Sequence, residues 1–278
     1  MSYKLKALQI KARQEVYTLL SGNNLSKLHG EGYDFSELRE YQVGDDIRKI
    51  NWTISAKLGK PYIKELHANR ELFVTVATLC DGSLYFGKDN KKQHKVAEVA
   101  SIIAYATQQQ NDLFMGINST VAHTYSTPPT KQIYHIEAFS KDIFETPLLS
   151  TKLNQQEAID NLFQQIYKPS LLFIVSDFLQ KIDLSILAQK HEVVAIIIRK
   201  NEEENPKYLG ETTLGDPTSR LKFETLFGKK TIQQYKTKLL EHDNELTEHF
   251  SEHRIKFIKI IDDENSISKL INFMNNPM

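Results

Sequence analysis

From residue 71 onward, the apolar positions of the chain follow two periods in turn. Short runs rich in β-branched residues are typical of buried strands, and they occupy residues 72–80, 113–117, 171–176, 192–198 and 255–261. Apolar residues spaced by three or four positions predict helices at residues 94–110, 131–144, 154–166, 184–190, 230–254 and 266–274. Strands that alternate with helices predict an α/β fold with a doubly wound, mostly parallel sheet covered on both faces.

The first 70 residues show a different pattern of apolar and charged positions. Apolar side chains at helical spacing predict a helix over residues 3–20. Residues 25–70 combine dense charge with glycines and isolated aromatic side chains, and no single period governs them, which predicts short strands and turns. We therefore expect an N-terminal helix (1–22), a charged β-rich segment (23–70) and an α/β domain (71–278).

Composition and charge narrow the classes of partner. Hydrophobic residues make up 40% of the chain and charged residues 25%, as in ordinary globular proteins. Lysine and arginine together number 35, and so do aspartate and glutamate, which gives a formal net charge of zero. A protein that binds nucleic acid usually carries a basic stripe, so we expect no nucleic-acid partner.

Cysteine usage and the length of the apolar runs bear on the compartment. Cys80 is the only cysteine, so the chain has no intrachain disulfide and no thiolate metal cluster. Its apolar runs are far shorter than the roughly 20 residues that span a bilayer. Residues 1–20 lack the apolar centre of a secretory signal. These features predict a cytoplasmic protein without an integral membrane segment.

Acidic side chains directly follow two of the predicted strands. Asp81 and Ser83 come after the first strand of the sheet, and Asp177 comes after residues 171–176. Ligands of a doubly wound sheet bind at the carboxyl ends of its strands where the strand order reverses, so neighbouring strands would place these side chains in one crevice. Their oxygen atoms suit Mg²⁺ as ligands. The alternative role of such an aspartate is to cap the following turn or helix.

A second cluster of charge lies at residues 31–52. It includes Arg39, Asp45, Asp46 and Arg48, and it ends at Trp52. Charges of alternating sign in so short a stretch indicate salt bridges that lock an irregular backbone. The functional interpretation is a protein-recognition surface with Trp52 as an aromatic anchor. The alternative is a solvated charged face.

The chain lacks the common catalytic fingerprints. It has no phosphate-binding loop, no dinucleotide-binding glycine pattern, no nucleophile elbow and no zinc-protease motif. His249 and His253 have the i,i+4 spacing of metal ligands, but the surrounding glutamates and lysines favour a solvated helix face.

The stretch from Asp34 to Trp52, followed by Ser55-Ala56-Lys57, resembles the signature of the bacterial family called domain of unknown function 58. That signature runs roughly D-F-x-E-L-R-x-Y-x-x-G-D-D-x-R-x-I-x-W-x-x-S-A-R. The resemblance implies that a von Willebrand factor A-like domain follows the charged segment.

In that family, the first strand of the A-like domain ends in the D-x-S-x-S motif of a metal-ion-dependent adhesion site. Asp81 and Ser83 match this motif, Tyr85 replaces its second serine, and Asp177 matches an aspartate after a later strand. The resemblance therefore implies a degenerate Mg²⁺ site, and Thr127 and Thr130 are the candidates for its missing threonine ligand. A site without metal is the alternative.

The resemblance also implies a function. Members of the family are associated with MoxR-type AAA+ ATPases, and they are thought to act as non-enzymatic adaptors or co-chaperones on client proteins. We expect the same role here. The rival class is a Mg²⁺-dependent phosphoester hydrolase that uses Asp81 and Asp177, against which stands the absence of a histidine or lysine in either of the two matched loops.

Overall fold

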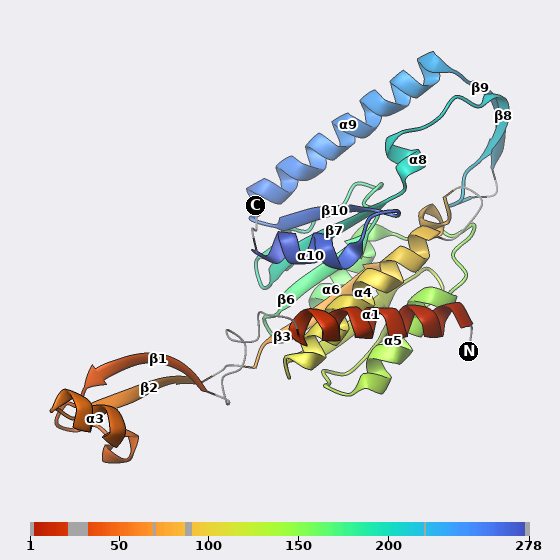
Figure 1. Ribbon diagram of the computed structural model, residues 1–278. Helices are drawn as coiled ribbons and strands as arrows, with labels where there is room; N and C mark the ends of the chain where they lie inside the picture. The colour runs from red at the N-terminus through yellow and green to blue at the C-terminus, as the bar shows by residue number, and fades with distance from the viewer. Residues whose placement is uncertain (1–2, 22–32, 69–70, 87–90, 220, 276–278) are drawn as a thin grey trace. The chain divides into compact units, whose positions relative to one another are not determined.

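The computed structural model describes residues 3–21, 33–68, 71–86, 91–219 and 221–275 (Figure 1). The chain divides into two compact units. The larger contains Met1–Tyr17 and Leu72–Met278, and the smaller contains Thr18–Glu71. The first helix, α1 (Tyr3–Ser21), thus contributes most of its length to the larger unit.

The larger unit is built on a six-stranded sheet in the order β10-β7-β6-β3-β4-β5. All neighbouring strands are parallel except β5, which runs antiparallel to β4 at one edge. The strands are β3 (Phe73–Leu79), β4 (Leu113–Ser119), β5 (Thr124–Ser126), β6 (Leu171–Ser176), β7 (Glu192–Arg199) and β10 (Lys256–Ile261). Because the chain passes from β3 to β4 and then returns to β6 on the other side of β3, the strand order reverses between β3 and β6. The predicted doubly wound sheet is confirmed.

Helices cover both faces of this sheet. Helices α4 (Lys91–Gln109), α5 (Ile133–Glu145) and α10 (Ser266–Asn275) lie on one face, with α1 packed outside α4 and α5 (Figure 1). Gln9 of α1 donates to the Glu137 carbonyl in α5 at 3.0 Å. The other face packs against α6 (Gln155–Gln165), α7 (Ser185–Ala188) and the end of α9 (Lys229–Glu252), where Leu246 and Phe250 enter the core.

The strands themselves explain why both faces are covered. Buried apolar side chains run almost without interruption along β3, β6 and β7, so that each strand buries both of its faces. Two helices begin near the carboxyl ends of the strands: α4 begins after η2 (Gly82–Tyr85), and α8 (Asn201–Glu204) begins just after β7. The hairpin of β8 (Gly210–Gly215) and β9 (Lys222–Phe227) then leads into α9.

The smaller unit is a two-stranded antiparallel hairpin with helical turns in its connection. Its strands are β1 (Tyr33–Glu40) and β2 (Tyr62–Ala68), and its turns are η1 (Ile47–Lys49) and α3 (Trp52–Leu58). The predicted short strands and turns are thus present, and α3 adds a helix that the sequence pattern did not reveal.

No helix among the described residues combines the length and the apolar character that crossing a bilayer requires.

A buried histidine beside β7 predicts a specific acid sensitivity. Burial lowers the pKa of His191 to about 4, and the charge of Lys190 contributes in the same direction. Below the ordinary histidine pKa near 6.5, His191 binds a proton in the unfolded chain but not in the folded chain. The free energy of unfolding is therefore highest at neutral pH and falls as the pH drops toward 4. His191→Asn keeps a partner for Ser170, whose Oγ lies 3.2 Å from Nδ1.

Between pH 7 and pH 5, the wild type should therefore lose about 2 kcal/mol more free energy of unfolding than His191→Asn. Urea unfolding of both proteins at the two pH values measures this difference. Equal pH dependence in the two proteins would show that His191 is protonated normally in the folded state.

Candidate functional site

The three side chains of the predicted metal site meet at the carboxyl end of the sheet. Strands β3 and β6 are neighbours, with Thr78 opposite Val175, so Asp81 and Asp177 follow adjacent strand ends. Both carboxylates are buried. The Ser83 hydroxyl donates to Asp81 Oδ1 at 2.6 Å and also helps to lower the pKa of Asp177.

The Asp81 carboxylate accepts hydrogen bonds at both oxygens. Oδ1 accepts from the backbone N–H and the hydroxyl of Ser83, at 2.9 and 2.6 Å. Oδ2 accepts from the Leu153 N–H at 3.2 Å and from Gln180 Nε2 at 2.6 Å. Asp81 is the N-cap of η2 and also ties this turn to the segments before α6 and after β6. This capping role is the alternative that the sequence left open.

Asp177 is paired with a lysine that the sequence did not point to. Lys92, in the first turn of α4, is completely buried. Its Nζ lies 2.8 Å from Asp177 Oδ2 and 2.7 Å from Glu203 Oε1. Glu203 belongs to α8, and its Oε2 accepts from the Lys200 N–H at 2.8 Å. One ammonium group thus joins α4, α8 and the end of β6.

The pKa values of the two carboxylates that Lys92 contacts, Asp177 and Glu203, shift in opposite directions. Burial alone would raise the pKa of Asp177, but Lys92 and Ser83 outweigh it and hold the pKa below the ordinary value. Burial dominates for Glu203 and raises its pKa despite Lys92. A second buried cation, Arg199, also lowers the pKa of Asp177. Its Nη2 lies 3.0 Å from Asp243, while its Nε and Nη1 have no hydrogen-bond partner among the described residues.

These contacts test whether the residues fit a Mg²⁺ ion. Mg²⁺ needs carboxylate oxygens that are free to enter a tight octahedral shell. Here Lys92 donates to Asp177, and four donors already contact Asp81. The arrangement therefore does not fit an added divalent ion, and the metal site stays a prediction from the sequence.

The two candidate threonine ligands lie elsewhere. Thr127 pairs with Gly116 in the middle of β4, where its Oγ1 accepts from the Gly116 N–H at 2.8 Å. Thr130 pairs with Phe114 near the start of β4. The segment after β5 runs back toward the amino end of β4, so neither threonine reaches the carboxyl ends of the strands. Neither of these two candidates therefore lies beside Asp81 and Asp177.

In the smaller unit, the charged residues of the signature fix the backbone. The Arg39 guanidinium forms two hydrogen bonds with the Asp45 carboxylate, at 2.7 and 2.8 Å. Asp45 also accepts from the Gln42 N–H at 2.8 Å. The Arg39 hydrogen bond, followed by that of Gln42, lowers the pKa of Asp45 to about 2. This pair closes the turn that follows β1.

The remaining polar residues of the signature act as caps. Asp46 is the N-cap of η1 and accepts from the Arg48 N–H at 3.0 Å, while the exposed Arg48 side chain lies 3.4 Å from the same carboxylate. Asn51 caps α3 by accepting from the Ile54 N–H at 3.2 Å. The buried Ser55 hydroxyl accepts from the Tyr62 N–H at 2.8 Å and ties α3 to β2. The predicted locking network is therefore present.

The apolar residues of the same segment point the other way, toward solvent. Trp52 is 69% exposed, and Val43 and Ile47 are exposed as well. Large apolar side chains on a rigid, polar support are typical of protein-recognition surfaces.

Two other features of the larger unit could suggest a ligand site: a cluster of metal-ligating side chains and a hollow along α9. Asp183, His249 and His253 could place three ligand atoms within 4.8 Å of one another. His249 Nε2, however, accepts from the Leu184 N–H at 3.0 Å, which gives this histidine a structural role at the start of α7.

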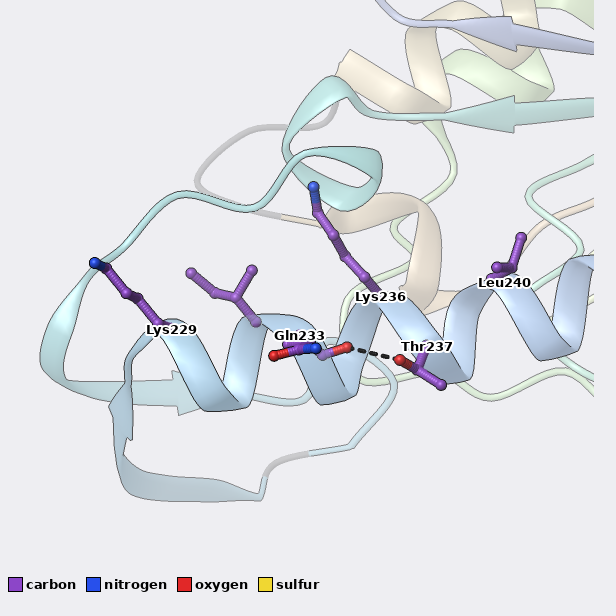
Figure 2. A pocket seen from close by; sticks show the side chains of 6 residues that line it. Lys229, Gln233, Lys236, Thr237 and Leu240 are labelled. Atoms are coloured by element: carbon purple, nitrogen blue, oxygen red, sulfur yellow. Dashed lines mark hydrogen bonds between the residues drawn. The ribbon is translucent and has the colours of Figure 1, made fainter.

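The second feature is a hollow of about 380 Å³ along the first half of α9 (Figure 2). Residues of a single helix line it, including Lys229, Lys236 and Leu240, and none of them is acidic.

One family model matches most of the chain. The sequence profile described as "Protein of unknown function DUF58" matches residues 37–245. Uncharacterized proteins of Mycobacterium bovis (Mb1516) and Mycobacterium tuberculosis (Rv1480) are 28% identical over 223 residues, which cover 77% of this chain and 70% of theirs.

Two solved structures from Bacteroides species are more distantly similar. One is the conserved hypothetical protein BatB of Bacteroides thetaiotaomicron, at 12% identity and a TM-score of 0.41, covering 72% of this chain and 95% of that one. The other is an aerotolerance-related membrane protein of Bacteroides fragilis, at 11% identity and a TM-score of 0.44, covering 73% and 97%.

The close packing of η2 predicts that its glycine cannot be replaced. A Cβ atom at Gly82 would lie 2.1 Å from the Pro217 carbonyl oxygen and 2.9 Å from that of Thr151, and backbone atoms cannot move aside cheaply. Gly82→Ala should therefore lower the free energy of unfolding by about 3 kcal/mol. Gly215→Ala is the matched control, because its Cβ would meet only Lys222 Cγ, at 3.9 Å.

Chemical denaturation of the two variants beside the wild type measures both effects. An unchanged stability of Gly82→Ala would show that the segments around Thr151 and Pro217 do not cover η2 as described.

Proposed function

The chain belongs to the DUF58 family of proteins of unknown function, and from this premise we propose that it is a non-enzymatic protein-binding adaptor of the cytoplasm. The observation that carries the proposal is the exposed Trp52 on a backbone held by the Arg39–Asp45 ion pair. Binding energy at protein interfaces concentrates in a few large side chains, and tryptophan is prominent among them.

Rigidity of the support matters as much as the anchor. Ordering a loop during binding costs free energy that a preorganised surface avoids. In the smaller unit, caps and ion pairs occupy the polar side chains, so that Val43, Ile47 and Trp52 are presented on turns that are already formed. This division between structural polar residues and exposed apolar residues fits an adaptor better than a solvated charged face.

The proposed partner is a MoxR-type AAA+ ATPase, and the proposed cargo is a client protein that the ATPase remodels. The resemblance of the Asp34–Trp52 signature to the domain of unknown function 58 supports this partner. The neutral net charge supports a protein partner over a nucleic acid.

No observation favours the rival phosphoester hydrolase. The carboxylates of Asp81 and Asp177 are buried and already engaged by donors from the protein. Lys92, the basic group beside Asp177, is itself hydrogen-bonded to two carboxylates. A general base needs a free lone pair within reach of the nucleophile, which such an ammonium group does not offer.

The adaptor proposal predicts that Trp52→Ala weakens binding without weakening the fold. We expect its affinity for the MoxR-type ATPase of the same organism to fall at least about tenfold, because a buried anchor typically contributes 2 kcal/mol or more. Tyr167→Ala is the matched control, since this aromatic side chain of the larger unit is 61% exposed and should be neutral. Biolayer interferometry gives the affinities, and thermal unfolding gives the stabilities.

Equal affinities of the two variants would remove Trp52 from the binding surface. A wild-type protein that fails to bind the ATPase at all, with and without ATP, would overturn the proposed partner.

A further inference from the structure

We infer that the ammonium group of Lys92 takes the place that a divalent ion has in a metal-ion-dependent adhesion site, so that this end of the sheet is held together without metal. The inference concerns the larger unit and does not depend on the adaptor proposal. It rests on the position of one nitrogen atom, 2.8 Å from Asp177 and 2.7 Å from Glu203.

The position of Lys92 in its helix makes paired negative charges necessary. Lys92 precedes Val96 by four residues and therefore lies on the buried face of α4, which continues through Val99 and Ile103. It also lies in the first turn of the helix, where the helix dipole disfavours a positive charge. A fully buried ammonium in such a position requires compensation by paired negative charges.

The two carboxylates come from separate parts of the fold and converge on this nitrogen. Asp177 follows β6, and Glu203 lies in α8 after β7, so the three residues are separated by 85 and 111 positions along the chain. Bringing distant elements together by oxygen ligands is what a structural cation does. Here a protonated amine supplies the positive charge, and Arg199 supplies a second positive charge that also acts on Asp177.

An ammonium group and a divalent ion exclude each other at this position. Both need the oxygens of Asp177, and two cations within about 4 Å of one another repel strongly in a buried site. Lys92 is completely buried, so its amine has no solvated position within the present packing. Mg²⁺ or Mn²⁺ binding would require the lysine side chain to leave the core.

The test removes the amine and asks whether metal can replace it. In Lys92→Met, whose unbranched apolar side chain is one heavy atom shorter, the melting temperature in EDTA should fall by roughly 10 °C, because two buried carboxylates lose their partner. Millimolar Mn²⁺ or Mg²⁺ should restore part of this loss. The wild type should melt at the same temperature in EDTA and in either metal.

Lys95→Met is the matched control. Lys95 is also buried in α4, but its Nζ donates to the Glu264 carbonyl at 2.6 Å, away from the paired carboxylates. This variant should be destabilised without gaining any response to metal. If Lys92→Met folds and responds to metal no more than Lys95→Met does, the inference is wrong.

A measurement on the wild type keeps the inference testable even if Lys92→Met does not fold. Electron paramagnetic resonance of free Mn²⁺ counts the ions that the protein removes from solution. We expect no difference between the wild type and Ser83→Ala. One bound ion per chain that disappears in Ser83→Ala would overturn the inference, and neither result depends on any partner protein.

Discussion

The ion-pair network around Lys92 is the interaction that holds the elements at the carboxyl end of the sheet together. A buried ammonium group is tolerated only when charged and hydrogen-bonding partners surround it, so α4, α8 and the end of β6 must all be in place together. The hydrogen bonds of Asp81 extend the same network to η2 and to the segments before α6 and after β6. Removal of one charged side chain of this network leaves another buried charge unpaired. The elements at the carboxyl ends of the strands therefore depend on one another.

The two units use their polar residues for the same purpose at different depths. In the larger unit, buried charges join distant elements beneath the surface. In the smaller unit, partly exposed pairs and caps such as Arg39–Asp45 and Asn51 hold the short turns between β1 and β2. A two-stranded hairpin on its own is only marginally stable in water, so such local restraints help it to keep one conformation. Among the described side chains of these turns, Val43, Ile47 and Trp52 face solvent.

The sequence predicted the α/β sheet and its helices well because burial imposes clear periods on them. Each helix and strand predicted above for residues 71–278 is present, and α4 begins at Lys91, three residues before the predicted start at 94. That error is instructive, because Lys91-Lys92-Gln93 reads as a solvated helix start, whereas Lys92 is fully buried. The sequence pattern did not predict helix α3, because seven residues are too few to show an apolar period. Its ends are set by the N-cap Asn51 and by Gly59 in the left-handed conformation. A lysine four residues before Val96 on the apolar face was the signal that could have located the network.

The metal-binding motif illustrates why a matched pattern does not fix the chemistry of a site. Asp81, Ser83 and Asp177 are close together, yet their roles depend on donors that lie far away in the sequence: Lys92, Leu153 and Gln180. An adhesion site binds its partner because the metal keeps one open coordination position. An amine buried beneath the surface offers a partner no such position, so the same three residues become a structural element. For the proposed adaptor function, recognition then rests on groups that solvent can reach, such as the exposed Trp52 side chain.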